Sequence, residues 1–188
     1  MGYNLYIGEA KPIIHMSDRH ARMGVQEEWG KSLGAPLNPS NNYSNKIWPG
    51  YIVWRRFTYQ VGLYSVFYAP ECPEKTNSPF SRCKGADCST CRGHSVWWIP
   101  EGGSQEDGRE GLMANRPGAA KLTQDHLTAF KTARQAWLNL PEKTRQEEGV
   151  GPDSDGNPVD WVLRRLDWLV WWTEWALENC EHPTFAND

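Results

Sequence analysis

The stretch NPVDWVLRRLDWLVWWTEWALEN, Asn157–Asn179, decides the fold of this chain. Asn157 is a good helix N-cap, and Pro158 then takes the first helical position that proline favours. Apolar residues follow on most sides of the expected helix, with five in a row from Trp168 to Trp172. A helix that is apolar almost all round is buried in a core or meets a partner. We therefore predict one long, largely buried helix from Pro158 to about Asn179.

Two further helices are expected before this one. Thr123 is a suitable N-cap with Asp125 in the first turn, and the apolar periodicity that follows ends at Pro141. Residues 51–61 also fit a helix, because Trp54, Thr58 and Val61 share one side of it. Gly62 would end that helix.

Short strands are predicted between the helices. Residues 3–7 and 12–16 suggest a hairpin at the start of the chain, and residues 64–68 and 95–99 suggest two more strands. The combination predicts an α+β fold in a single domain, 1–188. It would contain a small antiparallel sheet, about three main helices and a zinc-bound loop inserted at 70–94.

Four of the five cysteines lie in this insertion, at positions Cys72, Cys83, Cys88 and Cys91. The last two have the Cys-x-x-Cys spacing, and proline, glycine and asparagine surround all four. Such a polar loop has little apolar surface with which to fold, whereas four thiolates around a tetrahedral Zn²⁺ would hold it. We predict one structural zinc ion bound by these cysteines.

Other uses of the cysteines remain open. Two disulfides would employ the same residues but belong to oxidising compartments, and His94 could replace one cysteine as a zinc ligand. A redox dithiol at Cys88 and Cys91 is less consistent with the sequence, because Gly93 and an expected strand follow instead of a helix. A catalytic zinc would keep an open coordination position, which a set of four cysteines fills.

Composition bounds the class of protein. The 188 residues carry a formal net charge of −3, which gives no general case for nucleic-acid binding, and 39% of them are hydrophobic. The longest apolar run is far too short for a membrane span, and the first residues lack a signal peptide's basic and apolar regions. We expect a soluble, cytoplasmic protein, for which oligomers are possible.

The charge is distributed unevenly along the chain. Residues 142–188 contain eleven acids and four bases, so the first 141 residues contain twelve acids and sixteen bases. Arginine grips anions bidentately and aromatic faces stack on flat rings, so together they suit a nucleotide-like ligand. The candidate ligand-binding residues are Arg19, Arg22, Trp54, Arg55 and Arg56. The alternative is that the tryptophans are core residues and the arginines are solvated.

Catalytic motifs are weak. Gly30-Lys31-Ser32-Leu33-Gly34 has the spacing of a nucleophile elbow but lacks the preceding apolar strand. His15, Asp18 and His20 form the only compact set of histidine and carboxylate, and could serve a hydrolase if their geometry matched. We therefore expect a binding protein rather than an enzyme.

The two ends of the chain, MGYNLYIGEA (1–10) and WWTEWALENCEHP (171–183), resemble small uncharacterised proteins of bacteriophages and bacteria. The resemblance implies a phage-associated origin, and with it the host cytoplasm as the site of action. Together with the basic and aromatic residues of the first half, this origin leads us to expect an accessory protein, stabilised by structural zinc, that sequesters a small anionic or nucleotide-like ligand in a pocket. Two alternatives remain: a zinc-stabilised interaction module or inhibitor of a host protein, and a hydrolase.

Overall fold

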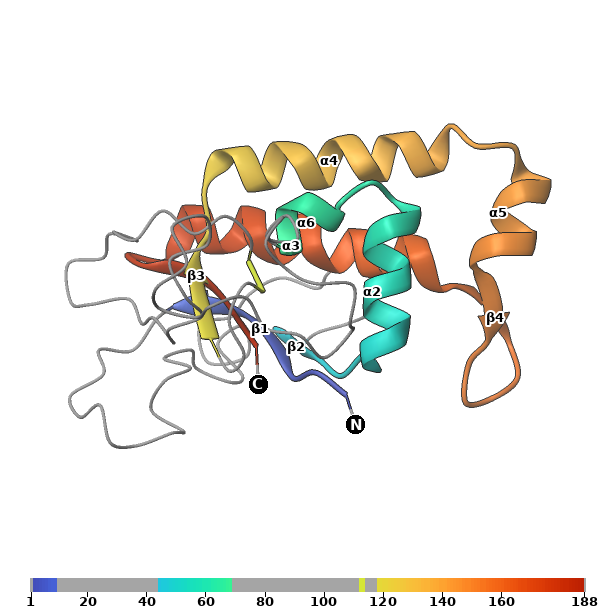
Figure 1. Cartoon of the computed structure of the whole chain (residues 1–188), viewed down its shortest axis with the longest axis horizontal. Coiled ribbons are helices and arrows are strands. Elements are labelled where there is room, and N and C mark those ends of the chain that lie inside the picture. The colour runs from blue at the N-terminus through green and yellow to red at the C-terminus, as the bar shows by residue number, and fades with distance from the viewer. Residues whose placement is uncertain (1, 10–43, 69–111, 114–117, 188) are drawn as a thin grey trace, which may run out of the picture.

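The computed structural model describes residues 2–9, 44–68, 112–113 and 118–187 (Figure 1). Within them, a four-stranded sheet has the order β2-β1-β6-β3, and every neighbouring pair is antiparallel. The strands are β1 (Leu5–Glu9), β2 (Lys46–Ile47), β3 (Gly118–Lys121) and β6 (Pro183–Asn187). The predicted α+β fold with a small antiparallel sheet is confirmed.

The two ends of the described chain form the centre of the sheet. β1 pairs with β6 from Leu5 opposite Asn187 to Glu9 opposite Pro183, and every residue of β6 is buried. The Glu9 carboxylate accepts hydrogen bonds from the backbone N–H of His182, at 2.9 and 3.1 Å, where the chain enters β6. The strand that was expected at 3–7 therefore forms two residues later, and its expected return at 12–16 lies outside the described residues.

The long C-terminal helix forms, but it begins later than predicted. α6 (Trp161–Asn179) has Asp160 as its N-cap, whose Oδ1 accepts from the Leu163 N–H at 2.8 Å. Residues 158–160 belong to β5 (Pro158–Asp160), which pairs with β4 (Val150–Pro152) in a hairpin. The prediction of Asn157 as the N-cap was wrong, because Asp160 is an equally good cap and the hairpin extends the chain up to it.

Asn157 instead closes the turn of this hairpin. Its backbone N–H and that of Asp155 both donate to the Asp153 Oδ1, at 2.8 and 2.9 Å. Gly156 has φ 84°, a conformation that glycine adopts without a steric penalty. These hydrogen bonds hold the pKa of the Asp153 carboxyl below its usual value.

α4 (Gln124–Leu138) runs antiparallel to α6 and packs on it. Lys131 Nζ lies 2.7 Å from Glu174 Oε1, and Arg134 Nε lies 2.6 Å from Asp167 Oδ1. The later residue of α4 thus pairs with the earlier residue of α6, as antiparallel helices require. The predicted cap at Thr123 is confirmed by a capping box with the side chain three residues further on, His126. A short helix, α5 (Glu142–Gly149), connects α4 to the β4–β5 hairpin.

α2 (Tyr51–Gln60) confirms the helix that was predicted over residues 51–61. Gly62 follows with φ 72°, and the chain then enters α3 (Tyr64–Phe67). The strand predicted at 64–68 was wrong: the rings of Tyr64 and Tyr68 stack 4.9 Å apart, and helical spacing brings such i, i+4 side chains together. In a strand the same residues would lie about 13 Å apart.

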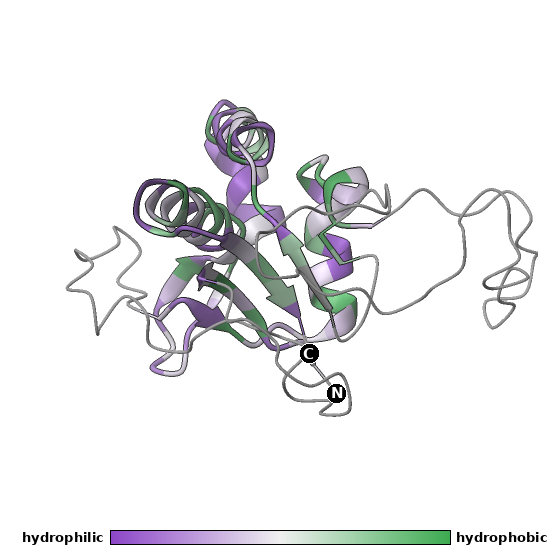
Figure 2. Cartoon of the chain, turned by 90° about the vertical axis from the view of Figure 1, so that its left-hand side faces the viewer, coloured by the Kyte–Doolittle hydropathy of each residue, from purple (hydrophilic) through white to green (hydrophobic). Residues whose placement is uncertain are grey.

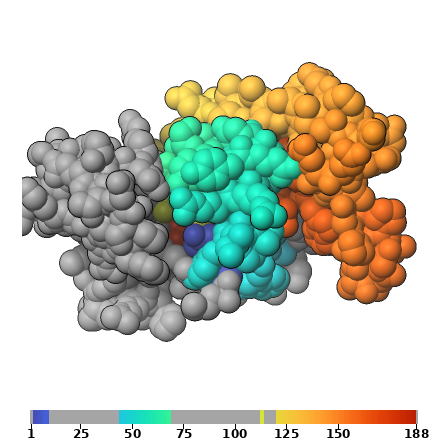
Figure 3. Space-filling model, turned by 45° about the vertical axis from the view of Figure 1, so that its right-hand side comes forward, coloured from blue at the N-terminus to red at the C-terminus, as the bar shows by residue number. Residues whose placement is uncertain are grey.

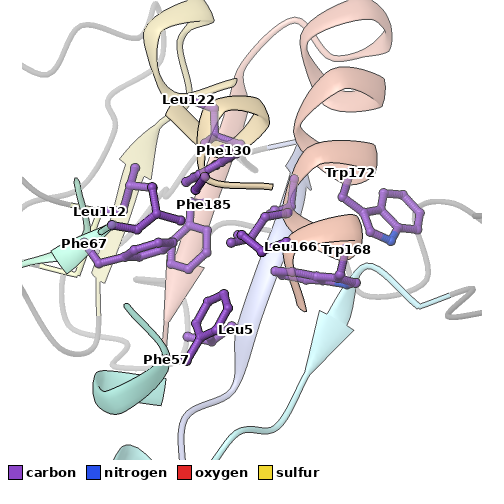
Figure 4. Packing of buried hydrophobic residues seen from close by; sticks show 14 of the residues in the cluster. Leu5, Phe57, Phe67, Leu112, Leu122, Phe130, Leu166, Trp168, Trp172 and Phe185 are labelled. Atoms are coloured by element: carbon purple, nitrogen blue, oxygen red, sulfur yellow. The ribbon is translucent and has the colours of Figure 1, made fainter. Parts of the chain in front are cut away.

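The core lies between the sheet and the helices (Figure 4). Phe67 of α3 illustrates it, with its ring centroid 5.7 Å from Phe130 of α4 and 5.5 Å from Phe185 of β6. Leu166 and Trp168 of α6 are fully buried in the same cluster. Figure 2 shows α4 and α6 lying together over the sheet, with α2 beside them. The predicted strand at 95–99 and the insertion at 70–94 lie outside the described residues.

Among the helices that the structure describes, none has both the length and the hydrophobicity needed to cross a membrane.

Candidate binding surface on helix α2

The amphipathic pattern of α2 decides which of its residues can meet a partner. Trp54, Phe57 and Thr58 are buried against the core. The remaining side of the helix faces outward, and Figure 3 shows α2 and α3 at the surface of the molecule, with α5 beside α2. Gln60 joins α2 to α5, because its Nε2 donates to the Glu148 carbonyl at 3.2 Å.

Large apolar side chains are exposed on this outward side and just before it. Ile52 is 77% exposed, Tyr59 is 58% exposed, and Trp48, in the link from β2 to α2, is 67% exposed. Val53 is also exposed. We define the α2 surface as these residues together with the two exposed arginines of the helix: Trp48, Ile52, Val53, Arg55, Arg56 and Tyr59.

The backbone around this surface is anchored to the sheet. The Tyr3 N–H donates to the Pro49 carbonyl at 2.9 Å, and Gly2 forms a bridge with Gly50 at the start of α2. A side chain at Gly2 would meet the Pro49 carbonyl oxygen at 3.0 Å, so this close approach favours glycine. These contacts with the residues that precede β1 therefore fix the positions of Trp48 and of the first turn of α2.

The formal charges of residues 44–68 are all positive. Residues 44–68 contain three bases, Lys46, Arg55 and Arg56, and no acid. The Lys46 ammonium lies 4.8 Å from the ring centroid of Tyr6 and 5.0 Å from that of Trp48, so a cation–π contact holds it beside the exposed indole. An anionic partner would therefore meet no like charge along this described stretch.

A stack of tyrosines supports Arg55. The rings of Tyr59 and Tyr64 lie 3.9 Å apart at 17°, and that of Tyr68 continues the stack beyond Tyr64. Arg55 Nη2 donates to the Tyr64 hydroxyl at 3.1 Å, and its Cζ lies 5.7 Å from the ring centroid. These contacts restrict the guanidinium to one edge of the stack while leaving the residue exposed.

The same contacts shift the pKa values of the cluster. Burial alone lowers the pKa of Arg55, but the hydroxyl groups of Tyr59 and Tyr64 outweigh it, so the pKa is raised. Burial also raises the pKa of Tyr64, and burial together with the nearby Tyr3 raises that of Tyr68 far above its usual value. At neutral pH Tyr64 and Tyr68 are therefore uncharged and Arg55 carries the charge.

The predicted ligand-binding residues do not all come together. Arg55 and Arg56 lie on the α2 surface, and their role in ligand binding stays a prediction. Trp54 is fully buried, with its ring centroid 4.9 Å from Phe57 and 5.3 Å from Phe67, so it is a core residue and offers no face to a ligand. Arg19 and Arg22 lie outside the described residues.

The predicted metal and hydrolase sites also fall outside the described part of the chain. This applies to the cysteines at 72, 83, 88 and 91, to His94, and to His15, Asp18 and His20. Within residues 2–9, 44–68, 112–113 and 118–187, no group of three or more histidine, cysteine or acidic side chains could hold a metal ion. The zinc site stays a prediction from the cysteine spacing.

Sequence reasoning missed the apolar part of the α2 surface. Ile52 and Val53 stand next to the buried Trp54, and nothing in their chemistry distinguishes a core residue from an exposed one. Helical spacing carried a usable signal, because Trp54, Thr58 and Val61 already defined the inward side. Ile52, Arg56 and Tyr59 lie on the opposite side of that helix.

Comparison with known proteins adds no relative: no family model, no curated protein and no solved structure matches this chain.

Proposed function

We propose that this chain is a non-enzymatic binding protein that docks an acidic segment of a protein partner on the α2 surface. The observation that carries the proposal is the exposure of Trp48, Ile52 and Tyr59 beside two arginines. Tryptophan, tyrosine and arginine are the residues that dominate binding energy at protein interfaces. Large apolar side chains that are exposed together, beside polar residues, mark a surface at which a partner binds.

The charge of the surface selects the partner. Lys46, Arg55 and Arg56 stand among the apolar residues without an acid in residues 44–68, so a complementary segment would carry carboxylates next to its own apolar side chains. Arg55 contributes less conformational entropy loss on binding than a free arginine, because Tyr64 already restricts it.

An elongated surface favours a protein segment over a small ligand. Ile52 and Tyr59 are seven residues apart on α2, which spans about 10 Å of helix at 1.5 Å per residue. Trp48 extends the surface beyond the start of the helix. If the chain is of phage origin, as the resemblance of its ends implies, the partner is a host protein and the site of action is the host cytoplasm.

The test combines capture with direct binding. A partner captured from a host extract is purified, and its affinity is compared for the wild type, Ile52→Glu, Arg56→Glu and Thr132→Glu. Thr132 is an exposed control position on α4. The proposal expects both α2 variants to bind roughly ten to a hundred times more weakly, and affinity to fall with salt. Arg56→Glu loses a bond to a charged group, and Ile52→Glu loses an apolar contact and places a like charge against the acidic partner. Wild-type affinity in both would overturn it.

A small nucleotide-like anion is the second candidate. The guanidinium of Arg55 at the edge of the Tyr59–Tyr64 stack is the observation that favours it, because flat rings and arginine suit a base and a phosphate. A native mass spectrum of the purified protein would reveal a bound ligand, and Arg55→Ala should weaken it by roughly 1.5–3 kcal/mol. Turnover of a substrate that is lost in His15→Ala or His20→Ala would favour a hydrolase instead.

A further inference from the structure

Arg165 is a half-buried arginine that reaches from α6 toward α2. Its Cζ lies 5.7 Å from the ring centroid of Phe57, a core residue of α2. The neighbouring Arg164 behaves differently, because its Cζ lies 5.3 Å from the ring of Trp161 on its own helix. The two adjacent arginines therefore place their charges in different surroundings.

The acids that flank Arg165 in the sequence are bound to other groups. Asp160 caps the helix and accepts the indole N–H of Trp137 at 3.0 Å, while Asp167 pairs with Arg134 of α4 at 2.6 Å. Glu174 pairs with Lys131. Among the described residues, the structure gives the guanidinium of Arg165 no carboxylate partner. Burial accordingly lowers the pKa of Arg165, with no neighbouring acid to offset the effect.

A second underpaired arginine lies on the adjacent helix. Arg145 of α5 has a buried Nε that finds no hydrogen-bond partner in the described part of the chain. α5 meets α2 where Gln60 binds the Glu148 carbonyl, and Gln60 is one turn beyond Phe57, the residue under Arg165. Arg145 and Arg165 thus belong to two of the three helices that meet at this junction.

We propose that the junction of α2, α5 and α6 binds a phosphate group, with Arg165 as the principal contact and Arg145 as the second. A half-buried guanidinium without a counter-charge is costly, and a bound oxyanion removes that cost while accepting paired N–H groups. A phosphate carries up to two negative charges, which matches two arginines better than a single carboxylate does. This site is separate from the α2 surface and does not rest on the partner proposed for that surface.

The test uses inorganic phosphate as the probe and thermal unfolding as the readout, at constant ionic strength set with sodium chloride. At about five times its Kd, phosphate should raise the Tm of the wild type by about 2–4 °C. Arg165→Met should lose this rise, and Arg145→Met should need roughly tenfold more phosphate for it. Arg164→Met is the matched control and should keep the full rise.

The variant also tests whether the free site is costly. Without phosphate, Arg165→Met should melt at or above the wild-type Tm, because methionine fills the space without an uncompensated charge. An absent Tm rise in the wild type, or an equal rise in Arg165→Met, would overturn the proposal. A nucleoside monophosphate and a phosphoserine peptide, compared with phosphate, would show which source of the phosphate group binds more tightly.

Discussion

The indole Nε1 of Trp137 donates to the Asp160 Oδ2 at 3.0 Å, while the Oδ1 of the same carboxylate accepts the N–H of Leu163 at 2.8 Å. One side chain thus caps α6 and also fixes the end of α4 against it. Gly149 completes the junction, because a Cβ there would lie 2.5 Å from Trp137 Cζ2 and 3.0 Å from Asp160 Oδ1. The connection from α4 through α5 to the hairpin is held at this point.

The double role of Asp160 predicts a large effect of its removal. Asp160→Ala loses the helix cap, worth about 1 kcal/mol, and leaves the indole N–H of the buried Trp137 without its acceptor, for a total of about 2–3 kcal/mol. Asp160→Asn keeps one acceptor oxygen and should lose less. Urea unfolding measures both. Asp155→Ala, in the exposed hairpin turn, is the control, and an equal loss in the control would contradict the assignment.

Gly149 should not tolerate a side chain. Gly149→Ala places a methyl group into the Trp137 ring, and overpacking of this kind costs about 1–3 kcal/mol. Gly50→Ala is the matched control, because its Cβ would make an ordinary contact of 3.7 Å with Val53. The free energies of unfolding of the two variants are compared by urea denaturation. Similar values would contradict the prediction, because they would mean that the Trp137 ring shifts to make room for the methyl group.

Trp168 should be a core residue whose loss is costly. It is fully buried, and its Nε1 donates to the Ser44 carbonyl at 3.0 Å, which links α6 to the segment that precedes β2. Trp168→Ala should destabilise the protein by about 3–5 kcal/mol, whereas Trp171→Ala, at a half-buried position, should cost less. Denaturant unfolding tests this. Little change in stability with a change of oligomeric state would instead place Trp168 at an interface.

The three main helices, α2, α4 and α6, were the most predictable part of the fold, because each carried a local signal. The threonine cap at Thr123 and the apolar periodicity after it were enough to predict α4. Asn157 and Asp160 are both good caps, and only the pairing of β5 with β4 decides between them. That pairing joins two separate strands, and helix-capping rules consider only the residues next to the helix end.

The sheet was harder to predict because its centre lacks an alternating pattern. β6 begins with Pro183, ends with Asn187 and is buried throughout, so its sequence shows none of the period-two alternation of a half-buried strand. The sequence of β3, Gly-Ala-Ala-Lys, also lacks a clear alternation of apolar and polar residues. Both strands depend on pairing with chain segments that are distant in sequence.

Of the residues in the two candidate sites, only those with an obvious charge signal in the sequence were predicted. Arg55 and Arg56 were selected for their charge, and arginine side chains are seldom fully buried. Trp54 was included because aromatic residues bind ligands, although its helical spacing with Thr58 already indicated the core. Arg165 escaped notice because its lack of a partner depends on the positions of Asp160 and Asp167 relative to α4.

The cysteine spacing predicts one equivalent of zinc per chain. Elemental analysis of the reduced, folded protein should find it, and removal of the metal by a chelator should lower the Tm, since a structural site couples binding to folding. Cys88→Ser should lose zinc, whereas Cys180→Ser should retain it. Cys180 is a free, half-buried thiol, and burial, together with Glu9, raises its pKa to about 12. Folded, reduced protein without metal would refute the zinc site.

The cap of α4 predicts a pH dependence of stability. The Thr123 N–H donates to His126 Nδ1 at 3.1 Å, so that nitrogen must be unprotonated in the folded protein, and burial lowers the pKa of His126 despite the nearby Asp125. The unfolded chain, with a histidine pKa of about 6.5, therefore binds the proton more readily than the folded one. The contribution of His126 is complete above that pH and falls as the pH decreases through and below it.

His126→Gln isolates this contribution from the other histidines. Glutamine at the same position keeps an acceptor for the Thr123 N–H, as in a capping box, but does not titrate. Urea unfolding at about pH 7.5 and about pH 5.5, on either side of the unfolded pKa, should show the wild type losing more stability than the variant. The same loss in both proteins would mean that His126 does not accept this hydrogen bond, and that Thr123 caps α4 without it.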